Sequence, residues 1–285
     1  MKVGRKVRSL QNNLRKYPMK KIKIQCHSVL RYGISKILVA STLILISVNA
    51  FAYMDDCVNA IKLENWKDGV KYCEPLAREN REASILTGDA YAQLRQGIKA
   101  QKFLQLYISK FVPKDKNLQQ VANGYTSLGN YYYFGEDGAK KDIKKGLEYI
   151  TKGAQLGNSI AQEQLGTVYF NGDNAPVNYP LAYMWYTISA NNGNQKAKNN
   201  YFAQHMTSYT QQSPYCVALG DQLLAQSYIE GTGGLSKNDN QARQYLIQAI
   251  ELYKEAKKPS EDELKYCPKQ KGLDLASAEK LLKSL

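Results

Sequence analysis

The chain has 285 residues, of which 44% are hydrophobic and 22% are charged, so its composition is that of a globular protein and excludes an intrinsically disordered one. Its formal net charge of +14 suggests by itself a nucleic-acid-binding protein. However, residues 1–36 contain 11 lysines and arginines and no acidic residue, and the rest of the chain carries a net charge of only +3. The positive charge therefore belongs to the N-terminal segment, and we expect no nucleic acid among the partners.

The N-terminal segment has the features of a secretory signal peptide. An uncharged run of 18 residues, 37–54, follows the basic residues and has a short apolar centre. Ala50-Phe51-Ala52 then supplies the small residues of a cleavage site. We expect residues 1–52 to be a signal peptide, with Met19 as an alternative true start, and the mature chain to be periplasmic or secreted. If the segment is not cleaved, its uncharged run is just long enough to anchor the chain in a membrane.

Four cysteines lie beyond this leader: Cys57, Cys73, Cys216 and Cys267. An even number in an exported chain indicates two disulfides, for which three pairings exist. We favour Cys57–Cys73, which would join two consecutive antiparallel helices, and Cys216–Cys267, which would tie the C-terminal segment to the preceding body. Four buried free thiols are the alternative. A zinc site is disfavoured, because no Cys-x-x-Cys pair occurs and the mature chain has one histidine, and we expect neither a metal nor a cofactor.

A repeated motif indicates the fold. Residues 128–135 and 165–172 both fit Leu-Gly-x-x-Tyr-x-x-Gly at an offset of 37, and residues 224–231 form a looser third copy. Gly88 and Tyr91 form a fainter copy. The small residue and the tyrosine lie three positions apart, which places them on one face of a helix, and the final glycine ends that helix in a left-handed turn.

A second motif follows each of the three strong copies. Small residues flank an aromatic one in three aligned sets: Gly146, Tyr149 and Gly153; Ala182, Trp185 and Ser189; and Ala242, Tyr245 and Ala249. Small residues at this spacing predict a helix face that another helix approaches closely. Each unit is therefore a helix, a glycine-bearing loop and a second helix.

These units resemble the Sel1-like repeat family, a relative of the tetratricopeptide repeat. The family's loop consensus is partly retained in Gly135, Gly138 and Asp142, and in Gly231, Gly233 and Asp239, whereas the unit at 172–180 lacks the acidic residue. The resemblance implies an all-α, right-handed superhelical solenoid of helix pairs. An open-ended stack must also cover its last apolar surface, so we expect the final segment to form a C-terminal capping helix.

We divide the mature chain by the spacing of these units. The second and third strong copies are offset by 59 residues where 37 is expected, which indicates an insertion between them. The expected segments are degenerate N-terminal repeats at 53–117, two Sel1-like repeats at 118–197, the insertion at 198–219, a Sel1-like repeat at 220–257 and the cap at 258–285.

The first helices offer a candidate binding surface. In this architecture, the positions just after the small residue of the motif and one turn later face a concave groove. Here those positions are Asn130, Tyr133, Phe134, Thr167, Phe170, Asn171, Gln226 and Ile229. Rigid aromatic and adaptable amide side chains are typical of a protein- or peptide-binding surface. Packing against adjoining repeats would explain Tyr133 and Phe170 equally well.

We therefore expect a scaffold or adaptor that binds a protein or peptide in the cell envelope or at the host interface, and not an enzyme. Gly231-Thr232-Gly233-Gly234 lacks the lysine of a phosphate loop, and disulfide pairing leaves His205 without a free cysteine to activate. We expect membrane contact only through an uncleaved leader. The alternative is an enzyme that acts on the cell wall or on β-lactams, which only the resemblance to cysteine-rich Sel1 proteins implies.

Overall fold

The computed structural model describes residues 53–114, 116–199 and 213–285, and within these ranges helices are the only regular secondary structure. The expected signal peptide, His205 and most of the expected insertion lie outside the described residues. None of the described helices combines the length and the apolar character that a membrane crossing requires. The prediction of an all-α fold is confirmed.

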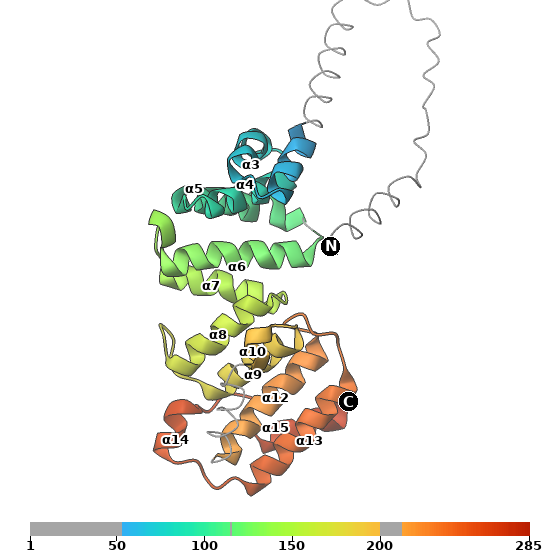
Figure 1. Cartoon of the computed structure of the whole chain (residues 1–285). Helices are drawn as coiled ribbons and strands as arrows, with labels where there is room; N and C mark the ends of the chain where they lie inside the picture. Colours follow the sequence, from blue (N-terminus) through green and yellow to red (C-terminus); the bar gives the residue numbers. More distant parts are fainter. Residues whose placement is uncertain (1–52, 115, 200–212) are drawn as a thin grey trace, which may run out of the picture. The chain divides into compact units, whose positions relative to one another are not determined.

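The helices form consecutive antiparallel pairs (Figure 1). In the N-terminal part, residues 53–62 are helical and precede α3 (Trp66–Cys73), and α4 (Arg81–Gln93) pairs with α5 (Gly97–Leu106). Short helical turns follow α3 and α5: η1 (Glu74–Leu76), η2 (Tyr107–Phe111) and η3 (Val112–Lys114). Two helix pairs therefore occupy the segment that the fainter copies of the motif predicted.

Three further pairs follow. They are α6 (Leu118–Phe134) with α7 (Ile143–Gln155), α8 (Ser159–Asn171) with α9 (Tyr179–Asn191), and α12 (Pro214–Glu230) with α13 (Asp239–Glu255). Shorter elements lie between and after them: η4 (Glu136–Gly138), α10 (Gln195–Asn199), α14 (Glu261–Tyr266) and α15 (Leu275–Ser284). Helix α12 begins before the expected boundary at residue 220, because Ser213 caps it by accepting a 3.1 Å hydrogen bond from the Cys216 nitrogen.

Local sequence signals set the ends of the paired helices. The side chains of Asn117 and Asn158 accept hydrogen bonds from backbone N–H groups in the first turns of α6 and α8, at 3.1 and 2.9 Å. Gly135, Gly172 and Gly231 end α6, α8 and α12 at φ values of 70°, 76° and 70°, where a side chain would be strained. A polar cap therefore sets the start of the first helix of a pair, and a glycine sets its end.

Successive pairs pack against one another and bury a series of apolar clusters along the stack. Contacts of α5 with α6, α7 with α8 and α9 with α12 join neighbouring pairs, and α15 covers α13 at the end of the series. Leu128, Leu165 and Leu224, which occupy the same position of the motif, are all buried. Ala278 of α15 is buried against Leu246 and Ile250 of α13. The expected solenoid with a C-terminal capping helix is therefore confirmed.

The glycine-rich loop after α12 contacts earlier parts of the chain. The Gly233 nitrogen donates a 3.0 Å hydrogen bond to the Gln155 carbonyl oxygen at the end of α7. The Gln162 side-chain nitrogen, buried in α8, donates to the Gly233 carbonyl oxygen at 2.8 Å. An added Cβ on Gly157 would lie 2.8 Å from the Gly234 Cα. These glycines thus permit close backbone packing, as expected for an inter-helix loop.

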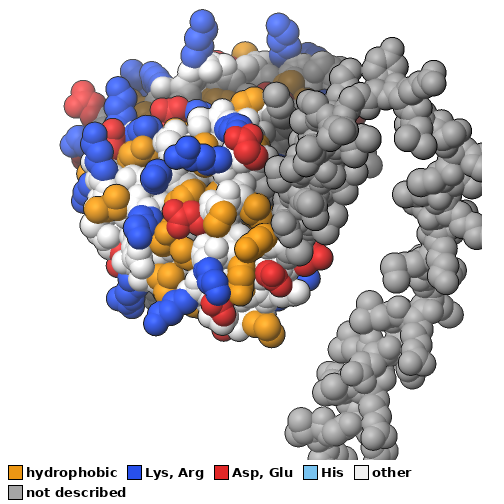
Figure 2. Space-filling view, turned by 90° about the horizontal axis from the view of Figure 1, so that it is seen from above, with side chains coloured by type: hydrophobic (Ala, Val, Ile, Leu, Met, Phe, Trp, Pro, Cys, Tyr) orange, Lys and Arg blue, Asp and Glu red, His pale blue; other side chains and the backbone are white. Residues whose placement is uncertain are grey.

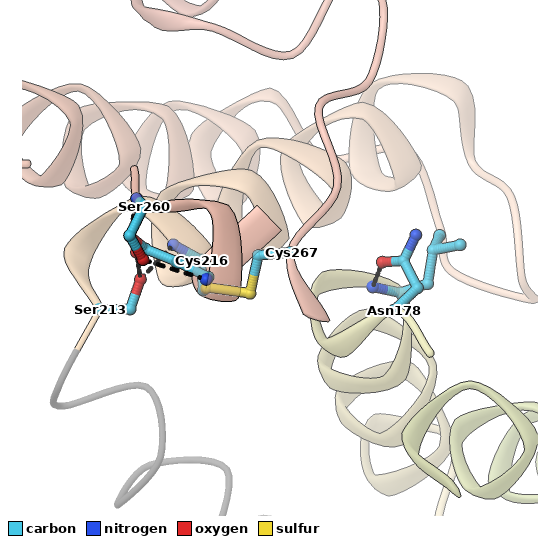
Figure 3. Close-up of a disulfide and its surroundings, with 7 residues drawn as sticks. Asn178, Ser213, Cys216, Ser260 and Cys267 are labelled. Carbon is cyan, nitrogen blue, oxygen red and sulfur yellow. Dashed lines mark hydrogen bonds between the residues drawn. A yellow bond between two sulfur atoms is a disulfide. The ribbon is translucent and has the colours of Figure 1, made fainter. Parts of the chain in front are cut away.

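Both expected disulfides are present. Cys57 in the first helical segment is bonded to Cys73 at the end of α3. Cys216 in the first turn of α12 is bonded to Cys267, which follows α14 (Figure 3). Beside the second bond, the Ser213 hydroxyl donates to a carboxylate oxygen of Glu263, whose backbone nitrogen donates to the Ser260 hydroxyl at 3.1 Å. The bond and these hydrogen bonds hold α14 against α12.

Charged side chains are dispersed on the face that Figure 2 presents. Lysine, arginine and acidic side chains alternate there with apolar and uncharged ones, without a concentrated basic patch. The described ion pairs are at the surface, such as Lys152 with Glu148 at 2.6 Å and Lys254 with Glu279 at 3.3 Å. Exposed pairs of this kind contribute little to stability. These ion pairs therefore add little to the stability that comes from the buried apolar side chains and the two disulfides.

Candidate functional site

A pocket of about 440 Å³ opens where the first helices of three consecutive pairs meet. Its apolar wall consists of Ile85 and Leu86 from α4 and Ile160 from α8. The polar lining consists of the acid Asp89 and of amide and hydroxyl side chains: Gln120, Asn123, Thr126, Ser127, Asn130 and Asn158. A surface that combines these groups can bury an apolar side chain and hydrogen-bond a polar backbone at the same time.

Hydrogen bonds fix part of the polar wall. The Asn158 side-chain nitrogen donates to Asn123 Oδ1 at 2.9 Å, while Asn158 Oδ1 accepts from the Ala161 nitrogen at the start of α8. The Thr126 hydroxyl donates to the Ala122 carbonyl oxygen at 2.8 Å, within α6. In contrast, Asn130 Oδ1 is buried and has no hydrogen-bond partner among the residues that the structure describes. The wall is thus preorganised by α6 and α8, with one amide oxygen left without a donor.

Asp89 is the one ionisable residue among those that line the pocket. The residue is exposed, and it has neither a hydrogen bond nor an ion pair within the described part of the chain. Surrounding protein atoms displace part of its hydration, and this desolvation raises its pKa from 3.8 to about 6. Asp89 therefore brings to the pocket an acidic group that forms no ion pair within the described residues.

The repeats can be assigned once this geometry is known. Residues 122–158, 159–194 and 217–253 match the family model of the Sel1 repeat. The chain carries three Sel1 repeats. They comprise most of α6 with α7, α8 with α9, and most of α12 with α13. Sel1 repeats generally mediate protein–protein interactions and are typically not enzymes.

Two solved structures are similar to this Sel1-repeat chain. One is a Sel1 repeat protein from Oxalobacter formigenes, at 18% identity and a TM-score of 0.43, with 70% of this chain and 86% of that chain covered. The other is a protective antigen of uropathogenic Escherichia coli with an SLR fold, at 20% identity and a TM-score of 0.29. The alignment with the antigen covers 64% of this chain and 48%, or about half, of the antigen. No curated protein matches the chain.

The predicted groove residues of the first Sel1 repeat have different environments. Asn130 lines the pocket. Tyr133 is half-buried, and its hydroxyl accepts a 3.0 Å hydrogen bond from the Asn174 side chain in the loop of the second repeat. Phe134 is 47% exposed and packs edge-on against the Tyr133 ring at 4.9 Å. Tyr133 therefore packs between repeats, which is the alternative that the sequence left open.

The predicted residues of the second Sel1 repeat contact α9 and its surroundings. The Thr167 hydroxyl lies 2.9 Å from the Tyr186 hydroxyl of α9. The Phe170 ring stacks on the Tyr179 ring at 5.3 Å, and Tyr179 stacks in turn on Tyr266 of α14 at 5.2 Å. Asn171 is exposed and donates to a carboxylate oxygen of Asp173 at 3.0 Å. Phe170 therefore belongs to a stack of three rings that joins α8, α9 and α14.

In the third Sel1 repeat, Gln226 is half-buried and Ile229 packs against the C-terminal cluster around Leu246. Of the eight predicted groove residues, Asn130 is thus the one that lines the pocket, and whether any of them binds a partner remains a prediction. The sequence did not single out Asp89, Asn123, Ser127 or Ile160. Asp89 follows Gly88 as Asn130 follows Gly129, so extending the motif register to the faint copy would have identified it.

Proposed function

We propose that this Sel1-repeat chain is a scaffold that binds a segment of a partner protein in the pocket between α4, α6 and α8. The observation that carries the proposal is the lining of that pocket, in which amide and hydroxyl groups lie beside apolar side chains across three helix pairs. Such a surface suits a polypeptide, because a polypeptide presents backbone donors and acceptors together with side chains.

The fixed amides explain how an extended segment would be held. Asn123 and Asn158 are oriented by their mutual hydrogen bond, so little side-chain entropy would be lost when a ligand binds. Ile160 lies at the start of α8 and is 56% exposed, which leaves apolar area for a ligand side chain to cover. The binding energy would then come from a few apolar contacts, with the amides selecting the backbone orientation.

Crosslinking from the pocket tests this proposal. A photoreactive amino acid at Ser127, which lines the pocket, should capture a partner protein in the cells that produce the chain. The matched control places the same amino acid at Lys144, an exposed position on α7 outside the pocket lining. We expect discrete products from position 127 and none of the same mass from position 144. Identical products from both positions, or none from position 127, would contradict the proposal.

We further propose that the chain acts outside the cytoplasm, in the envelope or after secretion. Two disulfides support this location, because disulfides persist in oxidising compartments and are rare in the cytosol. N-terminal sequencing of the protein recovered from its producing cells tests it directly. We expect a mature chain that begins at Tyr53 and contains no free thiol. An intact N-terminus on protein recovered from the cytosol would contradict export.

The chain's role in this proposal is non-enzymatic. Within residues 53–114, 116–199 and 213–285, no group of three or more histidine, cysteine or acidic residues could hold a metal. No contact among the described side chains favours the alternative of an enzyme acting on the cell wall or on β-lactams, and that alternative stays an untested prediction. Incubation of the purified chain with a chromogenic β-lactam and with peptidoglycan fragments is the direct assay for it.

A further inference from the structure

We propose that the pocket between α4, α6 and α8 recognises a lysine or arginine side chain of the bound segment, with Asp89 as its ionic partner. This inference rests on the proposed function and specifies the chemistry of the partner. It follows from the carboxyl group of Asp89, from the apolar and amide side chains that line the pocket beside it, and from the lack of further metal-ligating side chains in that lining.

The acidic group in the pocket, Asp89, has no basic partner among the described residues. Asp89 is the single ionisable residue of the lining, and no lysine or arginine pairs with it among the described residues. The charged side chains of α4 on the N-terminal side of the pocket are Arg81 and Glu82, neither of which lines it. A partly desolvated carboxylate gains most from a ligand that brings both a positive charge and hydrogen-bond donors.

The surroundings of Asp89 suit the shape of a basic side chain. Ile85 and Leu86, one turn earlier on α4, form an apolar wall next to the carboxylate. Lysine and arginine pack their methylene stems on apolar surface while the charged group reaches a polar partner. Gln120 and Asn123 of α6, which line the same pocket, carry amide oxygens that add acceptors for further donors.

An organic cation fits this site better than a metal ion. No second carboxylate, histidine or cysteine lines the pocket, and Asp89 belongs to no group of metal-ligating side chains in the described ranges. Divalent cations require several hard oxygen ligands arranged around one point. An ammonium or guanidinium group needs only one carboxylate and a few neutral acceptors.

Selection from a random peptide library displayed on phage tests the inference with the full chain as bait. We expect the selected peptides to share a lysine or arginine at one aligned position. In a binding titration with one such peptide, replacing its basic residue by glutamine should weaken binding to the unaltered protein by roughly tenfold or more. The same replacement should make little difference to Asp89→Asn, because the ionic partner is already absent.

Glu82→Gln is the matched control, since Glu82 is exposed on the same helix outside the pocket and the variant has the same net charge as Asp89→Asn. It should behave like the unaltered protein. Two results would contradict recognition of a basic side chain and leave the scaffold proposal standing. One is a set of selected peptides without a shared basic residue. The other is an equal loss of affinity in Asp89→Asn when the basic residue of the peptide is replaced by glutamine. Failure to select any peptide would instead contradict the peptide-binding function itself.

Discussion

The phenolic hydroxyl of Tyr183 in α9 donates a 3.2 Å hydrogen bond to Oδ1 of Asp221 in α12. This bond joins the second and third Sel1 repeats. Asp221 is only 3% exposed, and no cation pairs with it in the part of the chain that the structure describes. Burial therefore raises the pKa of Asp221 from 3.8 to about 7, against the smaller opposing effect of the Tyr183 hydrogen bond.

We predict that this carboxyl group makes the third repeat less stable as the pH rises. The folded protein holds the proton of Asp221 up to about pH 7, whereas the unfolded chain releases it near pH 4. The groups that face Asp221 are the hydroxyls of Tyr183, Tyr245 and Tyr253, and burial raises the pKa of each, so they remain neutral in this range. The stabilisation is thus complete below pH 4 and is lost as the pH rises from 4 through about 7.

Thermal unfolding between pH 4 and pH 8 measures this dependence. In the unaltered protein, the melting temperature should decrease between pH 4 and pH 7. In Asp221→Asn most of this decrease should be absent, because the amide does not ionise. Glu251→Gln, at an exposed position on α13, is the control and should retain the decrease of the unaltered protein. The same pH profile for both variants would show that Asp221 is not the group responsible.

Gly146 in α7 allows the two helices of the first Sel1 repeat to touch. An added Cβ there would lie 2.6 Å from the backbone nitrogen of Tyr133, which cannot move without displacing α6. Gly146→Ala should lower the free energy of unfolding, because overpacking costs about 1–3 kcal/mol, although alanine stabilises a helix by up to about 1 kcal/mol relative to glycine. Denaturant titration should show no such loss for Lys144→Ala, which is exposed on the same helix.

Tyr133 and Phe134 are adjacent aromatic residues with different environments, so they form a matched pair. Tyr133→Ala should cost roughly 2 kcal/mol, below the cost of removing a fully buried ring, because it empties a half-buried site between repeats. Phe134→Ala should cost at most about 1 kcal/mol, mainly the edge contact with Tyr133. Equal losses would contradict the packing role of Tyr133. Neither variant should reduce crosslinking from position 127.

Removal of each disulfide should affect only its own end of the solenoid. Replacing Cys216 and Cys267 by serine opens a loop with a sequence separation of 51, and such a loss typically costs about 2–5 kcal/mol. Because α3 packs against α4 and η1, at the other end of the series from this loop, amide hydrogen exchange should accelerate in α13, α14 and α15 and stay unchanged in α3. Replacing Cys57 and Cys73 should give the converse pattern. Acceleration along the whole chain in either variant would disprove this independence.

The sequence predicted the helix pairs because each repeat uses the same small and large residues at the same positions. Gly129 and Gly166 mark the close approach of paired helices, and Gly135 and Gly172 end the first helix of each pair. These are local requirements that recur at a fixed spacing. The disulfide pairing also followed, since each bond connects elements that lie close along the chain or at the same end of the stack.

The position of the pocket on the first helices was not predicted. The expected groove residues lie in the last turns of α6, α8 and α12, whereas Asn123 and Ser127 lie nearer the middle of α6 and Ile160 at the start of α8. The motif marks the contact between the two helices of one pair, as at Gly129 against Ile150, and does not mark the surface that the first helices of neighbouring pairs share. Contacts such as that between Gln162 and Gly233 depend on how repeats stack and have no local sequence signal.

The bond between Cys216 and Cys267 also determines how the chain would carry a mechanical load. It encloses α12, from its first turn, together with α13 and α14 in one covalent ring, while α15 lies beyond the ring. Tension applied at the C-terminus would first peel α15 from α13 and then pass through the sulfur atoms to the start of α12. The terminal repeat would therefore be shielded from extension, and the strain would reach the contact between α9 and α12.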